Sequence, residues 1–492
     1  MEPAGTVERG LAVLRALCAE PRRRTRATDL VRTTGLARST VDRVLATFVH
    51  LGHLRIDDRD VLLAPRLMEL GEAYLNGSGL PRLLGPHARR LADELDESVS
   101  LAVPDGADIR FIGQFTRRRT LSVAFRVGDT LPADRCAAGL ILRDPSAPWA
   151  EDDQLVEPGL VAIAMPVRDP GGRAVCALSA VSHTSRHTAA GLREHVLPRL
   201  RETAAAMETA LRTAPAPQSP PAAFHDASRA AKAELGTEYL QSLARALAVL
   251  VALGSAPGGL TLADAARATG LPRATVRRAV QALERTGYAA ADGTRFVLLP
   301  RVLELGYAHL SELSLQQIAQ PHLADLVARV RESASLAVLS GDDVVYVARV
   351  PTVGIMSVDI TVGTRFPAYA TSMGRVLLAG LPGERLAAIT PRPLTSRTVA
   401  SAGELAAAVR QAARDGYALV DQELEEGVRS IAVPVRDGTG RTVAAVNVAT
   451  HAGRATPAGL VDRVLPELRR TAARIEADLR HVPAALPGPE GV

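Results

Sequence analysis

The sequence predicts an α+β protein built from two tandem copies of one two-domain unit. Three observations support this prediction: a repeat that spans most of the 492 residues, a helix-turn-helix pattern near the start of each copy, and short strands mixed with helices in the remainder. In that remainder, strands and helices alternate irregularly. This favours an α+β sandwich over a doubly wound parallel sheet.

The repeat appears as matching segments at two fixed offsets. Thr34–Val41 recurs as Thr269–Val276, an offset of 235 residues (269 − 34). Further on, Ile163–Asp169 recurs as Ile431–Asp437, an offset of 268 residues (431 − 163). The change in offset predicts that the first copy lacks 33 residues (268 − 235), between about positions 142 and 157.

Composition is that of several folded domains in one chain. Hydrophobic residues make up 47% and charged residues 23%, which excludes global disorder, and the length suits three or four domains of about 150 residues. The net charge of +5 is too small to identify a nucleic-acid partner by itself. Cys18, Cys136 and Cys176 are too few and scattered for a disulfide framework or a zinc site, so no metal is predicted. The start lacks a signal-peptide pattern and the apolar stretch 243–254 is too short to span a bilayer, so we expect a cytoplasmic chain with no membrane partner.

Residues 261–285 have the pattern of a helix-turn-helix. Thr261 is a suitable N-cap for a first helix, Gly270 suits the tight turn, and Pro272 suits the start of a second helix. In the second helix, apolar residues recur at i, i+4 and i+7 and predict one buried stripe. The stripe consists of Val276, Val280 and Leu283 in the second copy and of Val41, Leu45 and Phe48 in the first.

A β-hairpin, or wing, is predicted after each helix-turn-helix. In the second copy it turns at Asp292-Gly293, and Arg295 is placed to meet a backbone phosphate. In the first copy it runs from Leu54 to Leu63 around an acidic tip at 57–60. The first wing is therefore expected to make the weaker phosphate contact.

Together these patterns predict double-stranded DNA as a partner, with the second helix of each pair in the major groove. A single such pattern is often a plain helical hairpin, but two copies at a fixed offset, each followed by a wing, favour DNA binding. Asp42 stands where the second copy has Arg277, which predicts unequal half-sites. The residues predicted to contact DNA are Arg38, Ser39, Thr40, Arg43, Arg273, Thr275, Arg277, Arg278 and Arg295.

The remainder of each copy has the pattern of a small-molecule sensor. In the second copy, Ser372-Met373-Gly374 opens a helix whose free N–H groups would suit a carboxylate, and Asp421 and Arg429 lie beside apolar strands. An alternative remains open on the residues alone. Ser372 would then only cap its helix, and Arg429 would pair with Glu425 or Glu426 on the surface. The expected elements of this region are a joining helix opened by 300–306, a helix at 321–331, strands at 336–339, 344–350, 356–361, 431–435 and 442–449, and helices at 404–416 and 457–479.

Each copy resembles the IclR family of bacterial transcription regulators, which combine a winged helix-turn-helix, a linker helix and a GAF-like effector domain. The segments Tyr239–Leu247, Tyr369–Arg375 and Asp421–Ala432 resemble the subgroup that controls protocatechuate, 4-hydroxybenzoate and β-ketoadipate catabolism. The resemblance implies a small aromatic or dicarboxylic acid effector, no cofactor, and either a homo-oligomer or a covalent pseudo-dimer on an operator. Implied effector-binding residues are Ser372, Met373, Gly374, Asp421, Ser430 and Asn447, to which we add Arg429 as a carboxylate partner.

The first copy departs from this pattern. The missing 33 residues are expected to include the counterparts of the 404–416 helix and of Asp421 to Glu423. We therefore predict that the first effector domain is degenerate and that only the second senses a ligand. Three further positions lose their polar side chains: Ser372-Met373-Gly374 becomes Ala137-Ala138-Gly139, Arg429 becomes Val161, and Ser430 becomes Ala162.

The predicted domains form two winged helix-turn-helix and GAF-like effector pairs. Their boundaries are 1–76 and 237–308 for the winged helix-turn-helix domains, 77–212 and 309–482 for the effector domains, 213–236 for a Pro/Ala-rich linker, and 483–492 for a flexible tail.

Two other functions stay open on the sequence alone. One is an acid-metabolising enzyme with an attached DNA-binding module, but the sequence contains no nucleophile elbow, His-Glu-x-x-His, P-loop or Gly-rich dinucleotide turn, so no catalytic residue and no enzyme activity are predicted. His183 and His187 are spaced as a metal pair but lack matching ligands in the second copy. The other is an architectural DNA-binding protein in which both sensors are inactive.

Overall fold

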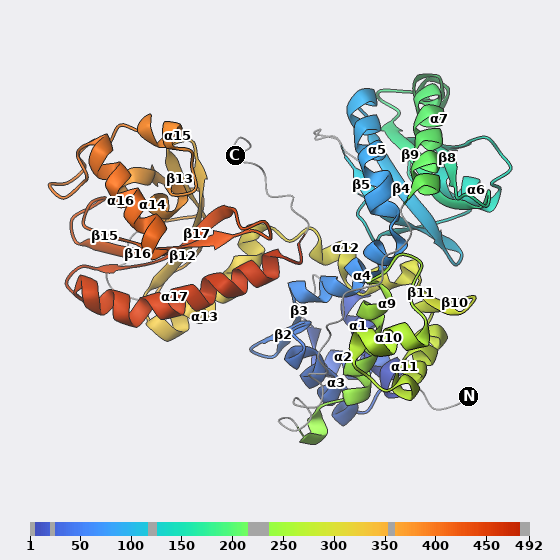
Figure 1. Cartoon of the computed structure of the whole chain (residues 1–492), viewed down its shortest axis with the longest axis horizontal. Coiled ribbons are helices and arrows are strands. Elements are labelled where there is room, and N and C mark those ends of the chain that lie inside the picture. Colours follow the sequence, from blue (N-terminus) through green and yellow to red (C-terminus); the bar gives the residue numbers. More distant parts are fainter. Residues whose placement is uncertain (1–4, 20–24, 117–124, 215–235, 353–359, 483–492) are drawn as a thin grey trace. The chain divides into compact units, whose positions relative to one another are not determined.

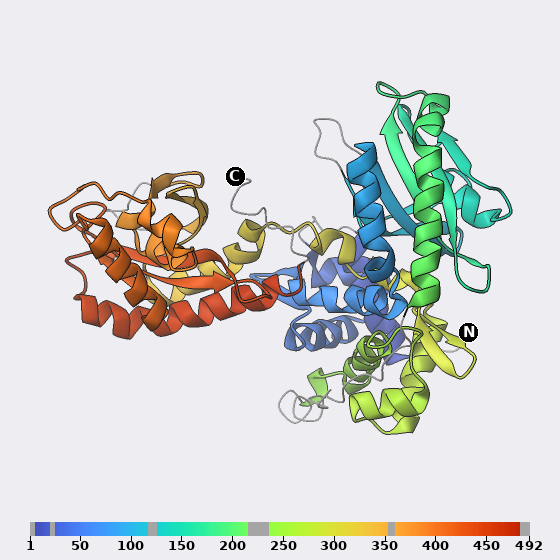
Figure 2. The ribbon, with the colours of Figure 1, turned by 45° about the horizontal axis from the view of Figure 1, so that its top comes forward.

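The structure is a computed structural model, and it describes residues 5–19, 25–116, 125–214, 236–352 and 360–482. It divides into two compact units, Met1–Ser311 and Glu312–Val492 (Figures 1 and 2). The first unit holds both winged-helix domains and the first effector domain, and the second unit holds the second effector domain. Most of the expected linker 213–236, most of the expected strand 356–361 and the tail 483–492 lie outside the described residues.

The first winged-helix domain forms around the predicted apolar stripe. Val41, Leu45 and Phe48 are buried where α3 packs on α1 and α2. Gly35 ends α2 with φ 68°, a left-handed backbone that glycine adopts without steric cost. The elements are α1 (Thr6–Ala19), β1 (Thr25–Arg26), α2 (Ala27–Thr34), α3 (Arg38–His50), β2 (Leu54–Asp57) and β3 (Asp60–Leu63), with the strands in the antiparallel order β1-β3-β2.

The second winged-helix domain repeats this arrangement. The hydroxyl of Thr261 accepts a hydrogen bond from the backbone N–H of Asp264 and caps α10, as predicted, and Gly270 turns the chain with φ 66°. Pro272 is the N-cap of α11 rather than its first residue. The elements are η2 (Gly236–Glu238), α9 (Gln241–Leu253), α10 (Leu262–Thr269), α11 (Arg273–Arg285), β10 (Ala289–Asp292) and β11 (Arg295–Leu298).

The segments that leave the two wings differ. After the first wing, η1 (Pro65–Leu67) leads into the 11-residue helix α4 (Met68–Ser78). After the second, η3 (Pro300–Glu304) is followed by Gly306 with φ 92°, which interrupts the helix, so α12 (Tyr307–Leu310) has only four residues. A longer joining helix therefore forms in the first copy only.

The two winged-helix domains pack against each other inside the first unit. Helix α1 contacts α9, and α4 contacts α9, α12 and β11. Backbones approach closely at Gly254, where a Cβ atom would lie 2.1 Å from the carbonyl oxygen of Ala73. Both ribbon views show α1, α4 and α9 side by side (Figures 1 and 2).

The first effector domain is a six-stranded antiparallel sheet in the order β6-β5-β4-β9-β8-β7. Helices α5 and α7 pack together and against the sheet, and α6 packs on a separate apolar cluster that contains Ala102, Ile141 and Ala162. The elements are α5 (Leu80–Leu95), β4 (Ser98–Asp105), β5 (Asp108–Phe115), β6 (Thr130–Pro132), α6 (Ala137–Arg143), β7 (Ala150–Asp153), β8 (Leu160–Arg168), β9 (Ala174–His183) and α7 (Ala189–Thr213).

The second effector domain has the same strand order, β14-β13-β12-β17-β16-β15, with apolar clusters on both faces of the sheet. Helices α13 and α17 cover one face, and α14 and α16 belong to the other. The elements are α13 (Leu315–Val330), β12 (Ser333–Ser340), β13 (Asp343–Val350), β14 (Arg365–Pro367), η4 (Ala368–Ala370), α14 (Ser372–Leu378), α15 (Gly383–Ala387), α16 (Ala402–Asp415), β15 (Ala418–Asp421), β16 (Val428–Arg436), β17 (Thr442–His451) and α17 (Pro457–Leu479).

The 33 missing residues fall between α6 and β7, inside the expected range, but the prediction that they include the counterparts of Asp421 to Glu423 is wrong. Strand β7 pairs with β8 as β15 pairs with β16, so that Asp153 takes the position of Asp421. The next residue of each copy, Gln154 or Gln422, has a left-handed backbone with φ 61° or 62°. The first copy instead lacks counterparts of α15 and α16, and the loss of the 404–416 helix is therefore confirmed. Strand β7 (Ala-Glu-Asp-Asp) and strand β15 (Ala-Leu-Val-Asp) share only their end residues, so sequence similarity alone does not identify them as counterparts.

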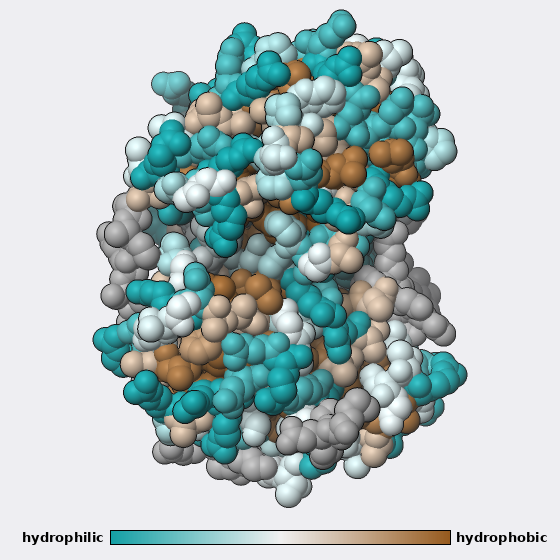
Figure 3. All heavy atoms as spheres, turned by 90° about the vertical axis from the view of Figure 1, so that its right-hand side faces the viewer, coloured by the Kyte–Doolittle hydropathy of each residue, from teal (hydrophilic) through white to brown (hydrophobic). Residues whose placement is uncertain are grey.

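Hydrophilic residues cover most of the face shown in Figure 3, and hydrophobic residues appear there in small separate groups. Large apolar side chains that are exposed in the described part of the chain are few, at positions 56, 155, 362 and 394. Within the described residues, no helix has the length and apolar character needed to cross a bilayer, and no cluster of His, Cys, Asp or Glu is arranged to hold a metal ion.

Candidate DNA-binding and effector-binding sites

The predicted DNA-contacting residues of both copies lie at the start of α3 and α11. The four arginines Arg38, Arg43, Arg277 and Arg278 are exposed, whereas the apolar stripe of each helix is buried. The N-terminal turns of both recognition helices therefore present guanidinium groups to solvent, as base and phosphate contacts in a major groove require. The remaining predicted residues on these helices are also on the outer side: Ser39 and Arg273 are exposed, and Thr40 and Thr275 are half-buried.

The two helices differ in the charge that they leave free. In α3, Nε of Arg38 lies 2.9 Å from Oδ1 of Asp42, an ion pair one helical turn apart. Among the described residues, no acidic side chain forms an ion pair with Arg277 or Arg278 in α11. The first helix therefore offers less unpaired positive charge to DNA than the second.

Arg295 of the second wing is fixed by a hydrogen bond to the loop before α10. Its guanidinium donates a 2.8 Å hydrogen bond to the carbonyl oxygen of Gly259, in the loop before α10. Leu260 and Phe296 pair through their backbones next to this contact. The residue is still exposed, so its remaining N–H groups stay available for a phosphate.

In the second effector domain, Ser372 and Ser430 meet between α14 and β16. Their hydroxyl oxygens lie 2.8 Å apart, and the side chain of Ser372 is fully buried. Ser372 does not cap its helix, because the hydroxyl of Thr371 accepts the hydrogen bond from the N–H of Gly374 at 2.9 Å. The free N–H group expected at Gly374 is thus already engaged.

Asn447 lies on the same face of the sheet as Ser430. Side chains alternate along a strand, and the neighbours of Asn447 on β17, Val446 and Val448, belong to the cluster on the opposite face. Asn447 is 3% exposed, and its Oδ1 atom has no hydrogen-bond partner among the described residues. A buried amide oxygen without a donor costs about 1–3 kcal/mol, so this atom is free to accept a further hydrogen bond.

Asp421 and Arg429 lie apart from that group. Arg429 is adjacent to Ser430 on β16 and therefore points to the other face, where its guanidinium donates to the carbonyl oxygens of Ala452 and Ala455. It also pairs with Asp421 at 2.8 Å, which holds the pKa of that carboxyl below its ordinary value. The alternative in which Arg429 pairs with Glu425 or Glu426 on the surface is therefore not the arrangement of these described residues.

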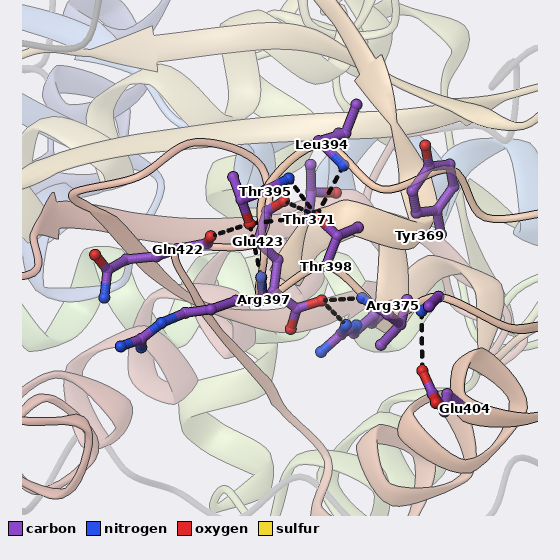
Figure 4. A network of polar contacts seen from close by, with 12 residues as sticks. Tyr369, Thr371, Arg375, Leu394, Thr395, Arg397, Thr398, Glu404, Gln422 and Glu423 are labelled. Atoms are coloured by element: carbon purple, nitrogen blue, oxygen red, sulfur yellow. Dashed lines mark hydrogen bonds and ion pairs between the residues drawn. The ribbon is translucent and has the colours of Figure 1, made fainter.

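An ion pair that the sequence reasoning missed joins α14 to the end of β15. The guanidinium of Arg375 and the carboxylate of Glu423 lie 2.5 Å apart, and both side chains are almost fully buried (Figure 4). Glu423 also accepts a hydrogen bond from the N–H of Val399 at 3.2 Å. Nε of Arg375 is buried and has no partner among the described residues.

The loop before α16 closes over this pair. The hydroxyl of Thr398 donates to the carbonyl oxygen of Glu423 at 2.6 Å, and that of Thr395 to the carbonyl oxygen of Gln422 at 2.7 Å (Figure 4). Tyr369 donates to the carbonyl oxygen of Arg392 at 3.1 Å. One network therefore fixes the polar end of α14 against the edge of the sheet.

A signal for this pair exists within the sequence itself. At the two offsets of the repeat, Arg375 corresponds to Leu140 and Glu423 to Leu155. Both partners of the ion pair are thus replaced by leucine together. The loop that covers the pair belongs to the segment that the first copy lacks.

Comparison with known families and proteins agrees with this architecture. The model described as "Bacterial transcriptional regulator IclR C-terminal" matches residues 72–148, 146–209 and 307–477, and the model "IclR helix-turn-helix domain" matches 6–58 and 242–293. The chain is 44% identical over 262 residues to the Pca regulon regulatory protein of Pseudomonas putida, which covers 52% of this chain and 90% of that protein. It is 37% identical over 254 residues to the p-hydroxybenzoate hydroxylase transcriptional activator of Acinetobacter baylyi, which covers 49% and 92%.

A solved transcriptional regulator from Rhodococcus sp. RHA1 is 52% identical, covers 49% of this chain and 98% of its own, and superposes with a TM-score of 0.46. The C-terminal family model alone matches more than half of the chain. Each helix-turn-helix match precedes a C-terminal match, which repeats the order of domains in both copies. The chain therefore belongs to the IclR family of bacterial transcriptional regulators and carries two helix-turn-helix domains and two C-terminal domains in one polypeptide.

Proposed function

We propose that this regulator controls genes of aromatic-acid catabolism and senses a hydroxylated aromatic acid in its second effector domain. The observation that carries the ligand assignment is the Oδ1 atom of Asn447, which has no partner among the described residues and is buried on the face of the sheet where Ser430 meets Ser372 of α14. The names of the two relatives, a Pca regulon regulatory protein and a p-hydroxybenzoate hydroxylase activator, support the catabolic role.

The polar groups on this face match the two ends of such a ligand. The unpaired atom of Asn447 is its amide oxygen, which accepts hydrogen bonds only, so in this orientation the side chain suits a phenolic hydroxyl rather than a carboxylate. The hydroxyls of Ser372 and Ser430 can turn to donate to a carboxylate. Ala337, Ala432 and Ala445 lie on the same face of the sheet and are small and apolar.

Asp421 and Arg429 take no direct part in this proposal, because they pair with each other on the opposite side of the strand. Met373 and Gly374 remain part of the proposed lining. Met373 contributes its side chain, which is fully buried in the apolar cluster on the α14 face, and Gly374 contributes its backbone.

The first effector domain has a reduced version of this face. The counterparts of Ser372 and Ser430 are Ala137 and Ala162, and that of Asn447 is Ser179, whose hydroxyl is also buried and has no hydrogen-bond partner within the described part of the chain. Two of the three polar groups are absent, and we propose that this domain does not bind the acid.

The test is calorimetry on the full chain with 4-hydroxybenzoate and with benzoate, which lacks the phenolic hydroxyl. We expect the chain to prefer 4-hydroxybenzoate by about 5-fold to 150-fold, from the roughly 1–3 kcal/mol of a buried hydrogen bond. Asn447→Ala should abolish the preference, and the matched control Ser179→Ala should retain it. Binding of neither acid, or a preference that survives Asn447→Ala, contradicts the ligand assignment.

The proposed control of DNA binding by the ligand is tested by a separate measurement. Titration of the full chain against its promoter region, at fixed salt, should show an affinity that 4-hydroxybenzoate changes and benzoate leaves nearly unchanged. An unchanged affinity with every aromatic acid would instead favour an architectural DNA-binding protein.

A further inference from the structure

The interface between the two winged-helix domains is centred on one position of the repeat. Tyr307 and Glu72 lie 235 residues apart, which is the offset of the repeat, and the hydroxyl of Tyr307 donates a 2.6 Å hydrogen bond to Oε1 of Glu72. In a twofold interface, a residue that lies on the axis contacts its own counterpart. The contact of Tyr307 with Glu72 fits a local twofold axis between the two domains at this pair.

Other contacts follow the same symmetry. Helix α1 packs on α9, its counterpart in the second copy, so closely that a Cβ atom on Gly10 would lie 2.6 Å from Leu243. Helix α4 packs on α12, which is also its counterpart. A Cβ atom on Gly71 of α4 would lie 2.3 Å from the ring of Tyr307.

The side chains around the axis are not symmetric. On one side, Nε of Arg285 lies 3.0 Å from Oε1 of Glu8. On the other side, the counterpart of Arg285 is His50, whose ring packs edge-on against Tyr239 with centroids 5.5 Å apart. Each domain thus presents a different surface to the other.

This asymmetry disfavours the pairing of identical domains from two chains. Two first domains would place a Glu72 carboxyl against a second Glu72 carboxyl, with no hydroxyl donor and with like charges facing each other. Two second domains would place two Tyr307 rings where one ring and one carboxyl now fit. Only the pairing of a first with a second domain satisfies both groups.

We propose that the Glu72–Tyr307 pair makes the two winged-helix domains of one chain pair with each other, so that one chain reads both half-sites of one operator in a fixed direction. This inference rests on the DNA-binding part of the proposed function and adds the stoichiometry and the polarity of binding. The two domains are covalently joined, and such a connection gives an effective concentration of about millimolar order, above that of a second chain.

The polarity follows from the recognition helices. In the part of the chain that the structure describes, Arg277 and Arg278 of the second domain have no ion-pair partner, while Asp42 pairs with Arg38 in the first domain. The half-site under the second domain therefore carries the larger share of the salt-dependent affinity. An operator for this chain has two unequal half-sites, and inverting one of them weakens binding.

The first experiment selects duplexes from a randomised pool with the full chain and measures the stoichiometry by native mass spectrometry. One chain per duplex with two unequal half-sites is the expected result. Two chains per duplex, or equal half-sites, overturn the proposal. If no duplex is enriched, the DNA-binding function fails, and the pairing is decided separately by the next measurement.

The second experiment asks whether the pairing occurs within one chain, without DNA. The contact of Glu8 with Arg285 is replaced by cysteines (Glu8→Cys with Arg285→Cys) in a mixture of isotopically light and heavy chains. We expect a disulfide within single chains, and disulfide-linked dimers that combine light and heavy masses overturn the proposal. If the cysteine variant fails to fold, a stoichiometry measurement on the unaltered chain decides the question, with a single chain expected and a dimer contradictory.

The third experiment disturbs the contact around Tyr307 with one substitution and uses a second substitution as a matched control. Gly71→Ala introduces a methyl group 2.3 Å from Tyr307, while Gly85→Ala in α5 meets its nearest neighbour, Phe115, at an ordinary 3.6 Å. We expect Gly71→Ala to reduce the advantage of a two-half-site duplex over a one-half-site duplex by at least about 10-fold. Gly85→Ala should leave that ratio unchanged, and equal ratios for both variants overturn the proposal.

Discussion

The hydroxyl of Tyr307 lies 2.6 Å from Oε1 of Glu72, the residue that occupies the same position in the first copy. This contact shows how a duplicated chain can keep a symmetric backbone arrangement while it specialises the side chains. Burial raises the pKa of the Glu72 carboxyl, and the hydrogen bond from Tyr307 opposes that shift without reversing it. Burial and the neighbouring carboxyl raise the pKa of Tyr307, which therefore remains a hydrogen-bond donor at neutral pH.

The raised pKa of Glu72 predicts a pH dependence of the winged-helix interface. A carboxyl whose pKa is higher in the folded state stabilises the fold fully below its ordinary pKa, and that contribution is lost as the pH rises through the raised value. Glu72→Gln, which cannot ionise, should remove this dependence. The free energies of unfolding of both proteins, measured between pH 4 and pH 8, are expected to converge at low pH and to separate in favour of the variant as the pH rises. If the free energies of unfolding of the two proteins changed with pH in parallel, the raised pKa of Glu72 would be contradicted.

The ion pair of Arg38 and Asp42 predicts that Asp42→Ala strengthens DNA binding. The change frees one guanidinium and removes one anion from the recognition helix, so the affinity should rise and the slope of log K against log salt should steepen by about one unit. Glu202→Ala breaks a comparable exposed pair with Arg199 in α7, far along the chain from either recognition helix. Titrations at several salt concentrations should show an unchanged slope for this control. A slope that Asp42→Ala does not alter would remove Arg38 from the DNA interface.

The buried pair of Arg375 and Glu423 predicts strong coupling between two substitutions. Arg375→Leu alone or Glu423→Leu alone leaves an uncompensated buried charge and should cost about 3–5 kcal/mol of stability. The double change reproduces Leu140 and Leu155 of the first copy and should cost far less than the two single costs added together. A double-mutant cycle of unfolding free energies measures the coupling. Additive costs would show that the two side chains act independently.

Much of the fold follows from patterns that repeat in the sequence. The apolar stripe of Val276, Val280 and Leu283 predicts a helix that is buried on one side, and Gly270 predicts a tight turn before it. The structure contains both. The family and the fold class were predictable for the same reason, because two copies at fixed offsets exclude most chance matches.

The candidate sites were less predictable, because they depend on which face of a strand a side chain occupies. Arg429 and Ser430 are adjacent on β16 and therefore point to opposite faces, but only the register of β16 with β17 shows which of the two lies on the face with Asn447. Arg375 and Glu423 lie 48 residues apart, so no local pattern joins them. The pairing of Tyr307 with Glu72 likewise requires two domains to be in contact.

The close approach at the start of α14 predicts that Gly374→Ala disrupts the second effector domain. A Cβ atom at position 374 would lie 2.0 Å from the carbonyl oxygen of Ala368, so η4 and α14 would have to separate and Ser372 would leave Ser430. We expect the change to lower the stability of this domain by more than 2 kcal/mol, by analogy with overpacked cores, and to abolish effector binding. Gly403→Ala in α16 is the control, because its nearest neighbour lies 4.0 Å away and the higher helix propensity of alanine should leave the domain unchanged or slightly more stable. Thermal unfolding and calorimetry on the full chain measure both effects, and a Gly374→Ala protein that unfolds and binds like the Gly403→Ala protein would rule out the close approach.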